Sequence, residues 1–439
     1  MIRLPSSALG KRLFRGTFWS VLGVTCSRGS LLVSMIVAAR LLGRTAFGEL
    51  GVIQSTVGML QSFGVLGMGQ TATKYVAENR LKNPGRASGV IALSNRIGLA
   101  GGLAMAALLV LLAPRVARSV LAAPHLTGAL RIAAGMLLFG ALLAVVTGAL
   151  AGLEAFKRMA RMNLVVAVLS SLFILIGVWR WGVTGAVCGL VAAAAAAWLL
   201  MRRALAAETR AAGLPPRGDF GDSKLAMLWG FGVPAVLGGV IVAPVNWIAA
   251  ALLVREPNGY AEMGIYSAVN HWRMAILHVP LVLGQVLTPM FAERAGASDA
   301  SSVRRLLRIG MKTTLAVSLP VVAVLALLSP TIVRFYGAGF ENAAPALVVM
   351  LATALLTSLQ YPLANAIVGM GRMWAIFWMN LGWGIVTVAL TYWALPWGAL
   401  GLAMAQCGGY LLFLIANVVL AQWMLSRLAH ESTSGVAER

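Results

Sequence analysis

Long apolar runs separated by short polar segments fill the sequence almost from end to end. Most runs extend over about 20 residues, the length that an α-helix needs to cross the hydrocarbon core of a bilayer. Because the runs are continuous rather than alternating, they predict helices and not the strands of a membrane barrel. The pattern predicts an all-α polytopic membrane protein with twelve transmembrane helices, near residues 17–42, 47–69, 88–112, 127–151, 163–179, 183–201, 225–252, 262–286, 308–328, 344–369, 374–395 and 399–425.

Short matches relate the two halves of the chain. Glu49-Leu50-Gly51-Val52 recurs as Glu262-Met263-Gly264-Ile265, and Trp181-Gly182 recurs as Trp397-Gly398, in the same order and at nearly constant offset. Each half holds six predicted helices, so both halves enter the membrane from the same side, as parallel repeats do. We therefore expect two pseudo-symmetric six-helix lobes around a central cavity, the architecture of many transporters. A duplication kept for stability alone is the alternative.

The predicted domain boundaries follow from this repeat. The N-terminal lobe covers residues 1–203 and the C-terminal lobe covers residues 225–425. A cytoplasmic linker at 204–224, rich in Pro and Gly near its centre, joins them, and a cytoplasmic tail occupies 426–439.

Composition and charge agree with a membrane location. Hydrophobic residues make up 60% of the 439 positions, charged residues only 11%, and the mean hydropathy is +0.86. A net charge of +22 could suit nucleic acid, but the basic residues cluster in short connections between apolar runs, which is the pattern that orients membrane proteins. Most of them fall on the cytoplasmic side when the N-terminus is cytoplasmic. We expect a multi-pass membrane protein with both termini in the cytoplasm and no nucleic-acid partner.

Three arginines, Arg28, Arg96 and Arg273, lie inside apolar segments, where no Asp or Glu lies comparably deep. A guanidinium at the centre of a bilayer costs roughly 3 kcal/mol or more and therefore usually faces a cavity or a partner. These arginines are candidate ligands of an anionic substrate headgroup. Arg28 could instead bond to backbone carbonyls. Arg96, about 12 Å from the cytoplasmic end of its helix, could extend back to the interface.

Uncharged polar residues gather around Arg273 in the sequence. Asn270 and His271 precede it in the same predicted helix, and Asn246 lies in the preceding one. Donors of this kind suit a polar cavity that binds a sugar or a phosphate. The alternative is hydrogen bonding between helices, which is worth only about 0.6 kcal/mol per contact.

Motifs of catalysis and metal binding are missing from the sequence. It contains neither a Walker-type loop nor HExxH nor a nucleophile elbow. Its three cysteines and four histidines show no ligand spacing. We expect no enzyme, no metal and no cofactor, so transport would draw on gradients or on the membrane potential.

The opening of the chain resembles a known family. Ala39-Arg40-Leu41-Leu42-Gly43, Gly67-Met68-Gly69-Gln70 and Lys74-Tyr75-Val76-Ala77-Glu78 are similar to the start of Wzx-type polysaccharide biosynthesis flippases, in the multidrug/oligosaccharidyl-lipid/polysaccharide exporter (MOP) superfamily. The resemblance implies a flippase that moves an undecaprenyl-pyrophosphate-linked oligosaccharide repeat unit across the inner membrane by alternating access. The products would be O-antigen, capsule or exopolysaccharide, and a polysaccharide polymerase is a candidate partner. A cation-coupled multidrug exporter of the same superfamily is the alternative, although it would favour a buried carboxylate.

Overall fold

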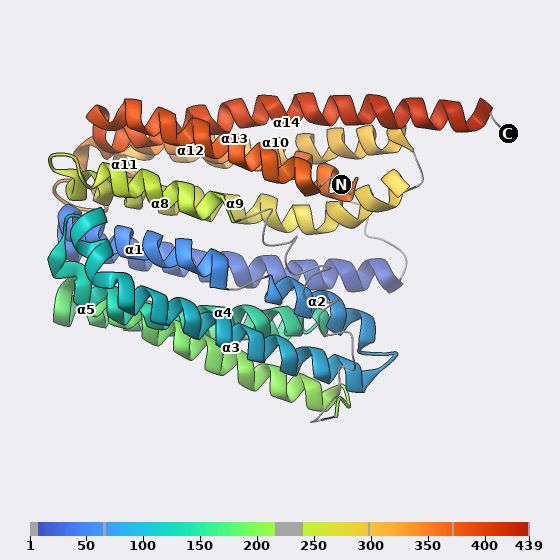
Figure 1. Cartoon of the computed structure of the whole chain (residues 1–439), viewed down its shortest axis with the longest axis horizontal. Helices are drawn as coiled ribbons and strands as arrows, with labels where there is room; N and C mark the ends of the chain where they lie inside the picture. The colour runs from blue at the N-terminus through green and yellow to red at the C-terminus, as the bar shows by residue number, and fades with distance from the viewer. Residues whose placement is uncertain (1–7, 65–66, 216–239, 297–298, 371–372, 438–439) are drawn as a thin grey trace. The chain divides into compact units, whose positions relative to one another are not determined.

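The computed structural model describes residues 8–64, 67–215, 240–296, 299–370 and 373–437 (Figure 1). These residues form helices joined by short turns, and no strand occurs among them. They divide into two compact units. The first unit comprises Met1–Leu42 with Glu49–Ala243, and the second comprises Gly43–Gly48 with Pro244–Arg439.

The first unit is organised around one central helix. Its helices are α1 (Ala8–Gly64), α2 (Met68–Asn79), α3 (Pro84–Arg115), α4 (Thr127–Gly152) and α5 (Phe156–Ala211). Helix α4 packs against α2, α3 and α5. Glycines permit the closest of these approaches, since a Cβ on Gly148 of α4 would lie 2.1 Å from the carbonyl oxygen of Gly69 in α2. Small residues at such crossings are typical of helices packed in membranes.

The second unit repeats this plan around α12. Its helices are α8 (Val242–Leu253), α9 (Gly259–Gly296), α10 (Ala300–Leu327), α11 (Ser329–Arg334), α12 (Ala344–Gly369), α13 (Met373–Ala394) and α14 (Gly398–Ala437). Helix α12 packs against α9, α10 and α14. Short turns of helix at Val116–Val120, Pro124–Leu126, Glu341–Ala343 and Leu395–Trp397 complete the described elements of both units.

Two helices in the first unit are too long for one crossing. Helix α1 has 57 residues and α5 has 56, so each would extend to about 85 Å if straight, against a hydrocarbon core of about 30 Å. Each is broken by non-helical backbone, at Gly43 in α1 and at Trp181 and Gly182 in α5. Both breaks fall in the gaps predicted between transmembrane segments.

The membrane character of the predicted fold is confirmed, and the helices are consistent with twelve crossings. Seven segments of the described chain are long and apolar enough to span a bilayer, and two of them, Phe156–Ala211 and Trp374–Arg427, are long enough for two crossings each. Most of the predicted segment at 225–252 lies outside the described residues, and its remainder contains α8.

One predicted helix boundary was wrong. The segment expected at 47–69 ends earlier, because α1 stops at Gly64 and a separate helix, α2, begins at Met68. Gly67 precedes α2 in the left-handed conformation, with φ 65°, which glycine adopts without a steric penalty. The hydrophobic pattern continues across this break and therefore did not reveal it.

The predicted linker and tail also begin with helix. Helix α5 continues to Ala211, because Leu205 is buried against Val146 and Leu150 of α4 and no helix-breaking residue occurs before Gly213. Helix α14 likewise continues to Ala437. The second half of the linker, from residue 216, lies outside the described residues, and the division into lobes stays a prediction.

Candidate functional site

Three polar side chains share one face of α9 in the second unit. Tyr266, Asn270 and Arg273 are spaced four and three residues apart, so they lie one above another along the helix. The Nε–H of Arg273 donates a hydrogen bond of 3.0 Å to Oδ1 of Asn270. Two of the predicted site residues are therefore bonded directly to each other.

The guanidinium of Arg273 is buried among aromatic rings. Its side chain is 2% exposed, and it lies over the ring of Tyr410 from α14, 5.7 Å from the centroid. Tyr266 and Tyr361 also lie close enough to interact with its charge. A cation over an aromatic face gains about 0.5–2 kcal/mol, but this contact leaves the net charge in place.

Arg273 has no carboxylate partner in the part of the chain that the structure describes. Its bond to Asn270 is also the only hydrogen bond of the guanidinium among those residues. Arginine stays protonated in proteins. The second unit therefore holds a permanent, uncompensated positive charge with spare N–H donors, which is the chemistry that favours an anion.

A second polar pair adjoins this face. Nε2 of Gln406 in α14 donates a hydrogen bond of 2.7 Å to Oδ1 of Asn246 in α8. Gln406 also lies within hydrogen-bonding reach of Tyr266, so Tyr266 connects the pair to the face that carries Arg273. We call this group of residues from three helices the Arg273 cluster, and its members are Asn246, Tyr266, Asn270, Arg273, Gln406 and Tyr410.

His271, the remaining predicted residue of the polar cavity, lies in different surroundings. Its Nδ1 is 2.6 Å from the carbonyl oxygen of Ser267, one turn earlier on α9. Its ring centroid lies 6.1 Å from that of Phe47, which in turn contacts the ring of Phe340. The structure thus places His271 in an aromatic contact region and not within the Arg273 cluster.

The other two predicted arginines belong to the first unit. Arg96 is exposed on α3 and forms neither an ion pair nor a hydrogen bond within the described residues. Arg28 lies in the helical part of α1, but its side chain falls outside the described residues. Their roles as headgroup ligands stay predictions.

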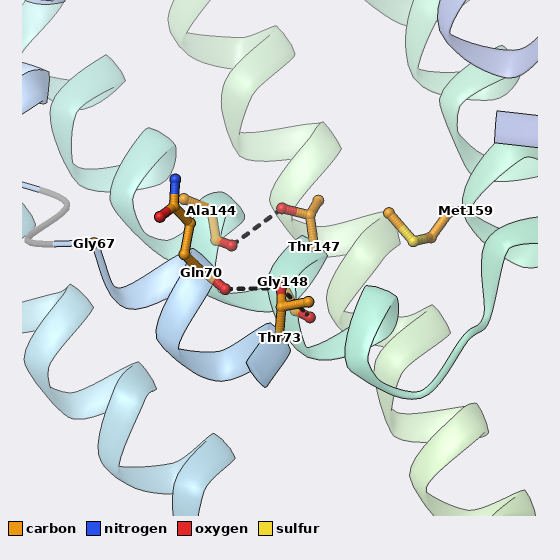
Figure 2. A pocket seen from close by; sticks show the side chains of 8 residues that line it. Gly67, Gln70, Thr73, Ala144, Thr147, Gly148 and Met159 are labelled. Atoms are coloured by element: carbon orange, nitrogen blue, oxygen red, sulfur yellow. Dashed lines mark hydrogen bonds between the residues drawn. The ribbon is translucent and has the colours of Figure 1, made fainter. Parts of the chain in front are cut away.

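The first unit contains a pocket of about 410 Å³ between α2, α4 and α5 (Figure 2). The hydroxyl of Thr73 donates to the carbonyl of Gly148, and the hydroxyl of Thr147 donates to that of Ala144. Gln70, part of the motif Gly67-Met68-Gly69-Gln70, also lines the pocket. Because every lining residue is uncharged, this pocket cannot neutralise an anionic headgroup.

The sequence interpretation missed three members of the Arg273 cluster. Tyr266 carries a visible signal, because its spacing from Asn270 and Arg273 places all three on one helical face. Tyr410 carries none, because it contacts Arg273 from α14, which is far from α9 in the sequence. Gln406 carries none either, because its contacts with Asn246 and Tyr266 join α14 to α8 and α9.

Comparisons with known proteins place these features in context. Residues 13–294 match the family described as "Polysaccharide biosynthesis protein". The chain is 26% identical over 424 residues to the EPS I polysaccharide export inner membrane protein EpsE of Ralstonia solanacearum, covering 92% of this chain and 93% of that protein.

Solved structures share the fold at low sequence identity. An inward-facing multidrug resistance MATE family transporter of the MOP superfamily matches with a TM-score of 0.78 and 14% identity, over 94% of this chain and 99% of that one. A MOP superfamily transporter from Pyrococcus furiosus matches with a TM-score of 0.70 and 15% identity, over 95% and 96% of the two chains. These likenesses show that the chain shares the helical fold of these two proteins.

Proposed function

The chain belongs to the polysaccharide biosynthesis protein family, and on that premise we propose that it is a flippase for a lipid-linked oligosaccharide. It is a multi-pass inner-membrane protein of the MOP superfamily, and it serves polysaccharide export. The substrate that we propose is an undecaprenyl-pyrophosphate-linked repeat unit of O-antigen, capsule or exopolysaccharide. A lipid diphosphate of this kind carries negative charge next to a polar sugar.

The uncompensated charge of Arg273 carries this proposal. A guanidinium offers paired N–H donors that match phosphate geometry, and Asn246 and Asn270 add amide groups that suit a pyrophosphate or a sugar. A multidrug exporter for cationic compounds would instead need a buried carboxylate, and no Asp or Glu is buried among the described residues. Arg28 and Arg96 are proposed as further contacts of the headgroup, and His271 as a contact of the sugar.

Transport by alternating access needs two lobes that move as bodies. We assign these roles to a lobe at 1–203 and a lobe at 225–425, joined by 204–224, with both termini and the segment 426–439 in the cytoplasm. In this orientation, an outside-positive potential favours outward movement of an anion by roughly 2.3 kcal/mol per charge per 100 mV. The names of the family and of the relative indicate transport rather than catalysis. A polysaccharide polymerase is the proposed protein partner.

A gene deletion tests the proposed function in cells. Without the protein, lipid-linked repeat units should accumulate on the cytoplasmic leaflet and surface polysaccharide should be lost, and the wild-type gene should restore both. Normal surface polysaccharide in the deletion strain, together with increased sensitivity to cationic drugs, would instead support the exporter.

A further inference from the structure

A groove on the second unit has the charge and the apolar lining of a lipid-binding site. Its lining residues come from α10, α12 and α14, three helices that pack against one another in this unit. Its volume is about 610 Å³, within the range of small-molecule pockets. Its lining residues are Arg304, Leu307, Arg308, Met311, Leu363, Val418, Ala421, Gln422 and Leu425.

The groove has a charged rim and an apolar floor. Arg304 and Arg308 are one turn apart on the same face of α10, and both are exposed. Neither forms an ion pair or a hydrogen bond with any described residue of the chain. Leu363 of α12 and Leu425 of α14 are buried at the base, so the apolar floor is built into the fold.

The acidic residue that directly precedes α10, Asp299, is already engaged elsewhere. Asp299 precedes α10 and accepts hydrogen bonds from the backbone N–H of Ser302, at 3.0 Å, and from the hydroxyl of Ser301, at 2.8 Å. It caps the helix end. Among the described residues nothing neutralises Arg304 and Arg308, so their positive charge is available to a group from outside the chain.

The level of the groove in the membrane is indicated by its neighbours on α14. Arg427 lies over the ring of Trp423, 4.1 Å from the centroid, and Trp423 directly follows Gln422 of the groove. Tryptophan paired with a basic residue is typical of the boundary between the acyl chains and the headgroups. Phosphates of bilayer lipids lie at this depth.

We propose that this groove binds an anionic phospholipid of the surrounding bilayer. The two guanidiniums hold the phosphate, Gln422 bonds to the headgroup, and one acyl chain runs along Leu307, Met311 and Val418. A phospholipid fits this groove because its phosphate complements the two exposed guanidiniums and its acyl chain complements the apolar floor. This site is separate from the Arg273 cluster, and it does not depend on the proposed function.

Native mass spectrometry of the purified full chain tests the proposal, with phosphatidylglycerol and phosphatidylcholine as probes. Wild type should retain phosphatidylglycerol preferentially. Arg304→Ala with Arg308→Ala should reduce that affinity by about fivefold per arginine. Arg305→Ala is the matched control, because Arg305 is also exposed on α10 but does not line the groove. It should bind as wild type does.

A second variant separates the groove from surface charge. Val418→Trp adds bulk to the floor without changing any charge, and it should weaken binding of phosphatidylglycerol while the unfolding temperature stays near that of wild type. Equal losses in Arg305→Ala and in the double variant would overturn the proposal, as would unchanged binding in Val418→Trp. A polyprenyl diphosphate that displaces phosphatidylglycerol at lower concentration would assign the groove to the transported lipid and also overturn it.

Discussion

Gly182 and Gly398 adopt the same backbone conformation in the two halves of the chain, with φ 56° and ψ −132° at the first and φ 58° and ψ −133° at the second. Each follows a tryptophan that remains exposed, Trp181 at 68% and Trp397 at 48%. Each also marks the point where one membrane-spanning helix ends and the next begins. The repeat inferred from short sequence matches is thus present in the backbone geometry of both units.

The two glycines should respond differently to alanine. A side chain in this region of φ and ψ costs about 1–3 kcal/mol. A Cβ at Gly182 would meet no atom within 4 Å, whereas a Cβ at Gly398 would lie 2.4 Å from Oε2 of Glu262. Gly398→Ala should therefore lower the free energy of unfolding more than Gly182→Ala, as measured by denaturant unfolding in detergent.

Gly382 supplies the control for these variants. It lies within helix α13 with no atom within 4 Å of an added Cβ, so Gly382→Ala should leave stability equal or slightly increased. If Gly398→Ala proved no more destabilising than Gly182→Ala, the contact of the added Cβ with Glu262 would not affect stability.

Glu262 stabilises the start of α14. Its Oε2 accepts a hydrogen bond of 2.8 Å from the backbone N–H of Ala399. Glu262→Ala removes that acceptor and should cost about 1 kcal/mol of unfolding free energy. Glu262→Gln keeps an acceptor and loses only the favourable charge at the helix end, about 0.3–1 kcal/mol.

Thermal unfolding at low ionic strength measures both Glu262 variants. Glu341→Ala removes the same charge from an exposed side chain in the same unit and should change the unfolding temperature little. If Glu262→Ala and Glu341→Ala lowered the unfolding temperature equally, the effect would come from net charge and not from capping of α14.

Asp299 makes stability depend on pH in the acidic range. Hydrogen bonds from Ser302 and Ser301 lower the pKa of this carboxyl from 3.8 to about 2. Because the folded-state pKa is depressed, the stabilisation is present above about pH 4 and is lost as the pH falls towards 2. The effect should be small, since the group is exposed to solvent.

Asp299→Ala tests this dependence. Its unfolding temperature should be lower than that of wild type at pH 5, and the two should converge as the pH approaches 2. A constant difference between the two proteins over this range would exclude the carboxylate as its source.

Arg96 should matter for transport but not for stability. Its side chain is exposed and forms no ion pair among the described residues, so Arg96→Ala should change the unfolding free energy by less than about 0.5 kcal/mol. If it contacts the headgroup, flipping should slow several-fold at equal protein levels. Arg131→Ala, on the exposed surface of α4, is the control, and equal rates in the two variants would remove Arg96 from the site.

Local patterns were enough to predict much of the fold. Hydrophobic run length located the helices, and the gaps at Gly43 and Trp181-Gly182 coincide with real breaks. The pattern did not predict the helix break before α2, which depends on the left-handed conformation of Gly67. The pattern also did not predict that α5 continues beyond residue 203, where Leu205 is buried against α4.

The candidate site was less predictable because its contacts join distant helices. Asn270 and Arg273 are close in sequence and proved to be bonded. Asn246 contacts the cluster through Gln406 of α14, a contact that no local pattern encodes. His271 is adjacent to Asn270 in the chain but points into other surroundings, because successive residues on a helix are rotated by about 100°.

The central claim is that the buried charge of Arg273 serves an anionic substrate. The most direct test is the initial rate at which a labelled undecaprenyl-pyrophosphate-linked oligosaccharide crosses the bilayer of proteoliposomes with equal amounts of folded protein. Arg273→Met keeps the side-chain bulk without the charge, and losing charged hydrogen bonds worth about 1.5–3 kcal/mol should lower the rate at least tenfold. Arg273→Lys should be intermediate, and Gly382→Ala should match wild type. A rate for Arg273→Met equal to that of wild type would contradict the account.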